Sequence, residues 1–132
     1  MPVLTALLLA ATPVQSPAAL IVYRDYAEPI LFAPTLLIDG VAAGKLGQKR
    51  VVAVAVPAGE HRLELRWPML ATQKTARLRL TLVPGTQRFV EVKALAGFGG
   101  GSALVEQELE VGAESAARCR PAVAGSTEPS NH

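Results

Sequence analysis

The sequence predicts an all-β protein, a small antiparallel β-sandwich of six to eight strands. Two segments alternate between leucine and polar side chains, short runs rich in valine and isoleucine recur, and Gly or Pro separates most of these runs. Alternation with a period of two indicates strands with one buried and one solvated face, which is typical of antiparallel sheets. Short strands at regular spacing, bounded by turn residues, are typical of a sandwich.

The first half of the domain contains four predicted strands, because β-branched and aromatic side chains favour strands. They cover residues 19–24, 34–38, 41–46 and 50–56. Asp39-Gly40 stands between two of the apolar runs, where this dipeptide favours a two-residue hairpin turn. The segment Pro57-Ala58-Gly59-Glu60 supplies the next turn, since proline fixes one backbone dihedral angle and glycine permits a positive one.

In the second half of the domain, apolar and polar residues alternate more strictly. Residues 61–67 place Leu63, Leu65 and Trp67 on one face, and residues 77–82 place three leucines opposite Arg77, Arg79 and Thr81. Pro84-Gly85 then turns the chain into a predicted strand over residues 88–94, and residues 97–101 form a glycine-rich bend. We expect the domain to extend over residues 19–111.

The end of the chain allows two interpretations. Residues 105–111 alternate as a last strand with Glu106, Glu108 and Glu110 on its outer face. A helix over residues 103–118 is the alternative, because Glu, Gln, Leu and Ala favour helices. Residues 112–132 are expected to be a short helical turn at 114–118 followed by a disordered tail from residue 121, where no apolar period remains.

Composition excludes several classes of protein. Half of the 132 residues are hydrophobic and 18% are charged, which excludes disorder for most of the chain. The formal charge of +2 is too small to indicate a nucleic-acid-binding protein. A single Cys excludes an intrachain disulfide framework and a CxxC metal site.

The first 18 residues are interpreted as a cleavable signal peptide. Residues 1–23 carry no charged side chain, and residues 3–11 form an apolar run that is too short to span a membrane. Ser16 and Ala18 are small residues that allow cleavage before Ala19. No Cys follows the run to accept a lipid anchor, so we expect a periplasmic or secreted protein. A buried strand or helix of a cytosolic domain is the alternative interpretation of residues 4–9.

Two single residues have structural interpretations. Cys119 lies between Arg118 and Arg120, and we expect a solvent-exposed, unpaired thiol. Arg24 ends the first predicted strand and precedes Asp25. We expect it to be partly buried and paired with a carboxylate that fixes the packing of the sheet.

No residue pattern predicts catalysis or a cofactor. His61 is the only His inside the domain, and no serine elbow or nearby Cys accompanies it. Its imidazole is expected to bond a main-chain group within the turn that begins at Pro57. One internal His provides too few ligands for zinc, and the three glutamates from Glu106 to Glu110 are spaced as a solvated edge. The glycine-rich segment 97–101 lacks the Lys-Ser/Thr of a phosphate loop.

The distribution of charge gives the one candidate binding surface. Residues 45–93 contain ten basic and three acidic side chains, a local charge of +7. If residues 60–67 and 74–82 pair as a hairpin, four arginines share one outward face with only Glu64 opposing them. These are Arg62, Arg66, Arg77 and Arg79. Such a face could bind an anionic polymer, a lipid headgroup or an acidic partner protein, or it could simply be a solvated face that deters edge aggregation.

The order of turn motifs resembles a known family. Tyr23-Arg24, Asp39-Gly40, Gly44-Lys45-Leu46 and the segment from Pro57 to His61 follow one another, and then come Pro84-Gly85 and Phe89-Val90-Glu91-Val92. This series resembles a bacterial envelope lipoprotein-like domain family of unknown function and, more distantly, PEGA-type modules. The resemblance implies an immunoglobulin- or transthyretin-like sandwich in the cell envelope, with the structural turn residues Asp39, Gly40, Pro57, Gly59 and His61. It implies no catalytic residue and no cofactor.

The predicted function is therefore that of an exported, non-catalytic accessory or binding module of the bacterial envelope. Its partner is expected to be an anionic envelope polymer or a protein, with no nucleic acid and no transmembrane span. The alternative is a structural subunit that pairs with a partner or with itself through an exposed strand edge. The sequence leaves the oligomeric state open.

Overall fold

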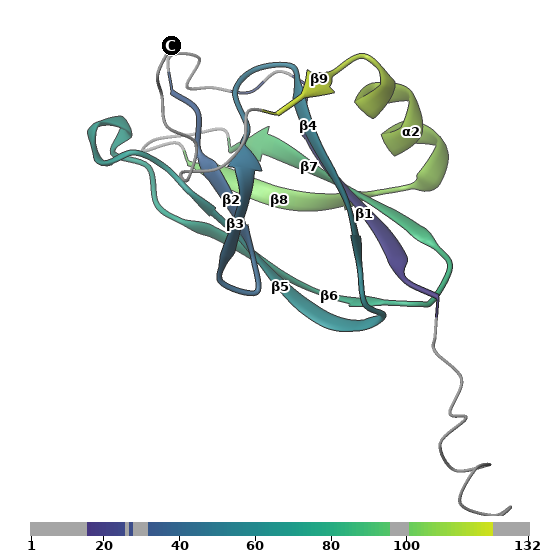
Figure 1. Cartoon of the computed structure of the whole chain (residues 1–132). Helices are drawn as coiled ribbons and strands as arrows, with labels where there is room; N and C mark the ends of the chain where they lie inside the picture. The colour runs from purple at the N-terminus through teal and green to yellow at the C-terminus, as the bar shows by residue number, and fades with distance from the viewer. Residues whose placement is uncertain (1–15, 26, 28–31, 96–100, 123–132) are drawn as a thin grey trace, which may run out of the picture.

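Two sheets face each other across an apolar core in the computed structural model, which describes residues 16–25, 27, 32–95 and 101–122 (Figure 1). The strands in chain order are β1 (Ala18–Arg24), β2 (Thr35–Ile38), β3 (Val41–Lys45), β4 (Arg50–Val56), β5 (Gly59–Arg66), β6 (Ala76–Leu82), β7 (Gln87–Ala94), β8 (Ser102–Gln107) and β9 (Arg120–Pro121). A 3-10 helix, η1 (Met69–Ala71), joins β5 to β6, and the helix α2 (Leu109–Ala117) follows β8. The predicted all-β sandwich is confirmed.

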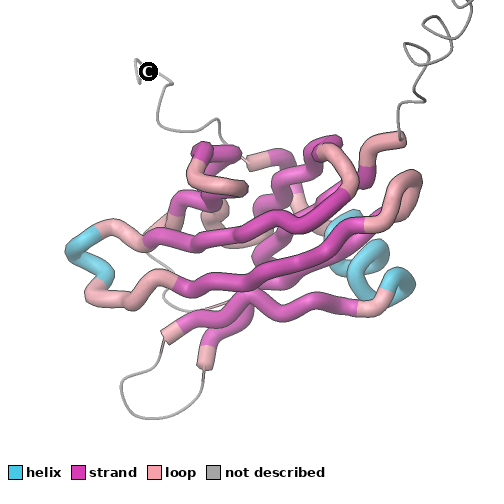
Figure 2. The backbone as a smooth tube through the Cα atoms, turned by 90° about the horizontal axis from the view of Figure 1, so that it is seen from below, coloured by secondary structure: helices cyan, strands magenta, loops and turns pink. Residues whose placement is uncertain are grey.

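The first sheet has the strand order β8-β7-β1-β4-β9 and the second has the order β3-β2-β5-β6. The β5–β6 hairpin is the longest feature of the second sheet and carries η1 at its closed end (Figure 2). α2 packs against β7 and β1 of the first sheet. The helix and the outer face of the β5–β6 hairpin therefore lie on opposite sides of the sandwich.

The alternating segments form strands with the expected buried faces. Leu63 and Leu65 are fully buried, and Trp67 follows them into the core. On β6, Leu80 and Leu82 are buried while Leu78 is half-buried. Asp39-Gly40 joins β2 to β3 with positive φ at both residues (53° and 84°), the backbone of a type I′ turn.

The pairing of the strands differs from the expectation in two respects. β1 pairs in parallel with β7, and β4 pairs in parallel with the short β9. The turns at Pro57–Glu60 and at Pro84-Gly85 connect strands of different sheets, so neither closes a hairpin. Parallel neighbours need long connections, and local alternation carries no information about them.

The prediction of a strand over residues 105–111 was wrong in its second half. β8 ends at Gln107, and Leu109 begins α2. The glutamates therefore do not share one strand face: Glu106 lies in β8, Glu108 is the N-cap of the helix and Glu110 lies in its first turn. The helical alternative is correct for the residues after Glu108, because their side chains favour a helix and the helix has a sheet to pack against.

Arg24 is more deeply placed than predicted. Its side chain is fully buried, and its guanidinium donates to the carbonyl oxygens of Ala27 (2.7 Å), Phe32 (2.8 Å) and Leu46 (2.8 Å). The guanidinium also lies 5.1 Å from the ring centroid of Trp67. Arg24 thereby fixes the loops around the end of β1 by hydrogen bonds to the main chain.

Asp25, next to Arg24, points outward. Its carboxylate accepts from Lys49 Nζ at 2.8 Å and from Arg118 at 3.0 Å, and these two cations lower its pKa. The carboxylate thus ties the end of β1 to the turn before β4 and to the end of α2.

The expectation of a solvent-exposed thiol at Cys119 is also corrected. Cys119 is half-buried, with Sγ 3.5 Å from the carbonyl oxygen of Ser115 and 3.9 Å from that of Arg24. Burial raises its pKa, so the thiol stays protonated despite the neighbouring arginines.

The prediction of a tail from residue 121 is wrong for Pro121, which belongs to β9. The apolar run of the proposed signal peptide, residues 97–100 of the glycine-rich bend and residues 123–132 of the expected tail lie outside the described residues.

Candidate functional site

The β5–β6 hairpin brings the four predicted arginines to one solvated face. Its antiparallel register places Arg62 directly opposite Arg79 and Glu64 opposite Arg77. Arg66 lies opposite Thr35 of β2 on the same side of the sheet. We call Arg62, Arg66, Arg77 and Arg79 the arginine face. Alternation with the buried leucines of β5 and β6 holds these side chains outward.

Two carboxylates neutralise part of the arginine face. Glu64 accepts from Arg66 at 3.0 Å and from Arg77 at 3.3 Å, so one carboxylate serves two guanidinium groups. Glu60 contacts Arg79 at 3.2 Å. Within the part of the chain that the structure describes, Arg62 makes no ion pair. The four arginines and these two glutamates together carry a charge of +2.

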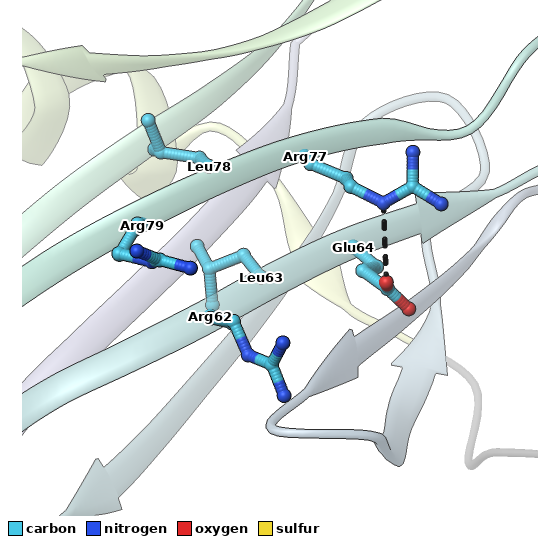
Figure 3. A pocket seen from close by; sticks show the side chains of 6 residues that line it. All are labelled: Arg62, Leu63, Glu64, Arg77, Leu78 and Arg79. Atoms are coloured by element: carbon cyan, nitrogen blue, oxygen red, sulfur yellow. Dashed lines mark hydrogen bonds and ion pairs between the residues drawn. The ribbon is translucent and has the colours of Figure 1, made fainter.

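Two shallow hollows adjoin at the Arg62–Arg79 pair. One has a volume of about 310 Å³ and extends toward Arg77 and Glu64. Figure 3 shows Arg62 and Arg79 at one end of this hollow and the Arg77–Glu64 ion pair at the other. The second has a volume of about 220 Å³ and is lined by Asp39, Glu60, Arg62 and Arg79. Both are open surface depressions in which guanidinium N–H groups stand as donors.

The structure corrects the predicted charge of this face. The sequence interpretation left only Glu64 opposing the arginines, but Glu60 and Asp39 also border it. Glu60 was interpreted only as the end of the turn from Pro57, although it lies two residues before Arg62 and its pairing with Thr81 puts it on β5. Asp39 was interpreted only as a turn residue, and the register of β2 and β5 could not be read from the sequence.

His61 connects two turns beside this face. Its ring is buried, with Nδ1 2.5 Å from Oδ2 of Asp39 and Nε2 2.6 Å from the carbonyl oxygen of Pro57. The other carboxylate oxygen of Asp39 accepts from the main-chain N–H of Arg62 at 2.9 Å. Hydrogen bonds to Asp39 and Pro57 raise the pKa of His61, and the bonds from Arg62 and His61 lower the pKa of Asp39.

A second polar group lies under α2. The Tyr23 hydroxyl donates to Oε1 of Glu91 at 3.3 Å, and the side-chain amide of Gln107 donates to the same oxygen at 3.1 Å. Burial and the negative charge of Glu91 raise the pKa of Tyr23 to about 12. A phenol with this pKa stays protonated near neutral pH and acts here as a donor within the fold.

Among the described residues, His, Cys, Asp and Glu form no group of three that could hold a metal ion. The helices within residues 16–122 that the structure describes include none that is both long and apolar enough to cross a bilayer.

Comparison with known proteins gives no relative. No family model, no curated protein and no solved structure matches the chain.

Proposed function

We propose that this chain is an exported, non-catalytic β-sandwich that binds an anionic polymer of the bacterial envelope through the arginine face. The observation that carries the proposal is the direct cross-strand pairing of Arg62 with Arg79. Like charges directly opposite each other destabilise a sheet. A ligand with closely spaced phosphate, sulfate or carboxylate groups would relieve this repulsion and gain charge-assisted hydrogen bonds.

The ion pairs leave the arginines available. The side chains of Arg66, Arg77 and Arg79 are 58%, 69% and 67% exposed. Surface ion pairs of this kind contribute little to stability and exchange easily for a ligand. Planar guanidinium groups suit bidentate contacts with oxyanions, and four of them along one hairpin suit an extended polyanion.

The environment of His61 supports a non-catalytic role. A general base needs a free ring nitrogen directed at a substrate. Both ring nitrogens of His61 lie at hydrogen-bond distance from acceptors of the fold, Asp39 and Pro57. The imidazole therefore serves as a bridge between two turns.

Retention on an anionic matrix tests the binding function. Arg62→Ala/Arg77→Ala should elute from heparin at clearly lower salt than the unchanged chain, because binding through several cations depends steeply on salt. The matched control is Lys93→Ala/Arg120→Ala, which removes the same charge from exposed positions on the first sheet, opposite the arginine face. It should elute close to the unchanged chain.

Elution of all three proteins at the same low salt would refute the proposal. Equal weakening by the two double variants would show that net charge alone causes retention. Parallel measurements with anionic vesicles and with an acidic protein distinguish a polymer from a lipid surface or a protein partner.

Export is tested by the N-terminus of the chain recovered from its host. Ala18 is 1% exposed and pairs with Val56, and the carbonyl oxygen of Pro17 accepts from Gly85 N–H at 3.1 Å. A cut that keeps both β1 and the bond between Pro17 and Gly85 must fall before Pro17. This position is two residues before the cut at Ala19 that the small residues indicate. Intact-mass measurement should find the apolar run removed. A recovered chain that still begins at Met1 would refute export.

A further inference from the structure

The outer edge of β4 is only partly occupied. Arg120 N–H donates to the carbonyl oxygen of Lys49 and Ala122 N–H to that of Val51, both at 2.8 Å. These bonds show that the main-chain groups of the odd-numbered residues point away from β1, because hydrogen-bonding directions alternate along an antiparallel strand. Ala53 and Ala55 have the same orientation. Within the described residues, no strand pairs with them on that side.

This edge lacks the usual protection of an exposed strand. Natural edges carry charges, bulges or prolines that prevent pairing with another chain. β3 has Lys45 and a bulge, β6 has Arg77 and Arg79, and β8 has Glu106. Residues 52–56 of β4 have the sequence Val-Ala-Val-Ala-Val, without a charged or polar side chain.

A groove lined by aliphatic residues and by main-chain polar groups runs along the same edge. It has a volume of about 200 Å³ and is lined by Ala43, Val51, Val52, Ala53, Val54, Pro121 and Ala122. β3 of the second sheet forms one wall and β9 closes one end. An added strand would thus hydrogen-bond to β4 and cover the apolar side chains at the open side of the sandwich.

We propose that β4 pairs with β4 of a second copy of this chain, antiparallel and about a twofold axis at Val54. The sequence of residues 52–56 is the same in both directions, so this register places Val52 opposite Val56, Ala53 opposite Ala55 and Val54 opposite itself. Ala53 and Ala55, whose main-chain groups point outward, then exchange N–H···O bonds with the partner copy. The palindrome identifies the second copy as the occupant, since a twofold interface must be self-complementary.

The boundaries of the free stretch fit this register. β9 covers the edge at Arg50 and Val51, and Pro57 ends β4 where the chain crosses to the other sheet. Ala122, which follows β9, donates to Val51 and lies beside Val52, so Ala53, Val54 and Ala55 of each copy meet without displacing β9. The pairing uses the sheet opposite the arginine face and therefore goes beyond the proposed function.

Light scattering with size-exclusion chromatography, over a range of concentrations of the full chain, tests the dimer. We expect a monomer–dimer equilibrium. Ala55→Lys should raise the dimer dissociation constant by about tenfold or more, because lysine on an edge strand opposes pairing with another chain and the two added charges would lie diagonally across the twofold axis. Ala113→Lys is the matched control on exposed α2 and should leave the equilibrium unchanged. Circular dichroism establishes that both variants fold.

A crosslink tests the register independently. In a Cys119→Ser background, Val54→Cys should form an intermolecular disulfide on mild oxidation, because a non-hydrogen-bonded pair has its Cα atoms about 4.5 Å apart. Val52→Cys is the matched control, since residue 52 faces residue 56 of the partner and should crosslink far less. A monomer at every concentration would overturn the proposal. So would a dimer that Ala55→Lys leaves unchanged, or pairing of this edge only with another protein.

Discussion

Gly112 of α2 stands directly against the ring of Phe89 on β7. A Cβ atom built on Gly112 would lie 2.3 Å from Cβ and 2.5 Å from Cγ of Phe89, closer than real side chains approach. Glycine inside a helix costs about 1 kcal/mol relative to alanine. This glycine allows the helix to approach the outer face of the first sheet and to cover Phe89, which is 5% exposed.

Gly112→Ala should therefore lower the free energy of unfolding, although helix propensity alone predicts a gain. We expect a net loss of about 1–3 kcal/mol, as for other overpacked sites, measured by urea unfolding. Gly47→Ala is the control, because its added Cβ meets Ala33 at an ordinary 3.8 Å. An increase in stability for Gly112→Ala would contradict the close packing of α2 on Phe89.

The bridge made by His61 predicts a dependence of stability on pH. The carboxylate of Asp39 and the carbonyl of Pro57 both accept, so both bonds form only when the ring is a protonated imidazolium. The pKa of His61 is raised above its ordinary 6.5. Its contribution to stability is fully present below pH 6.5 and is lost as the pH rises through the raised pKa.

The free energy of unfolding, measured in urea from about pH 5 to about pH 9, should fall over that interval. His61→Gln should flatten the curve, whereas His132→Gln, which removes the other His, should not change it. Asp39 affects stability at acid pH. Its pKa is lowered from 3.8, so its contribution to the free energy of unfolding is lost as the pH falls through that lowered pKa. An unchanged pH profile in His61→Gln would contradict the charged bridge.

Arg24 is expected to be the most sensitive charged residue of the fold. Arg24→Met would remove the guanidinium from the carbonyl oxygens of Leu46 and Phe32 and leave that of Ala27 with the Gln48 amide, and a buried acceptor that loses its partner costs about 1–3 kcal/mol. We expect a loss of about 3 kcal/mol or more in urea unfolding, with a shift in the emission of Trp67, the only Trp.

Arg50→Met is the matched control, because Arg50 makes an exposed hydrogen bond to Pro121 at 3.0 Å. It should cost less than about 1 kcal/mol. Equal losses of unfolding free energy in the two variants would contradict the role of Arg24 in holding the loops around the end of β1.

Alternation was sufficient to predict the part of the fold that is local. The leucines of β5 and β6 define a buried face, and once the two strands pair, the positions of Arg62 and Arg79 on the other face follow from geometry. The turn at Asp39-Gly40 depends on two residues with positive φ, and it too was predictable. These features need no knowledge of distant segments.

The remaining features depend on contacts between distant parts of the chain. The parallel pairing of β1 with β7 joins segments almost 70 residues apart, and no local pattern records it. Residues 109–111 continue the alternation of β8, yet they begin the helix α2, which packs on β7 and β1. At the arginine face, the counter-charges of Glu60 and Asp39 depend on register, which a single sequence does not determine.

The pairing of Arg62 with Arg79 predicts that stability and binding oppose each other. Arg62→Thr removes a like charge directly across the hairpin and places a β-branched residue in a strand, so it should raise the free energy of unfolding by about 0.2–1 kcal/mol at low salt. The gain should shrink as salt screens the repulsion. Arg66→Thr is the control: Arg66 faces Thr35 and pairs with Glu64, so no gain is expected. If Arg62→Thr is more stable and also elutes from heparin at lower salt, the Arg62–Arg79 pair costs stability and serves binding. On a merely solvated face, the same variant would gain stability without any loss of heparin binding. A loss of stability in Arg62→Thr would contradict the repulsion itself.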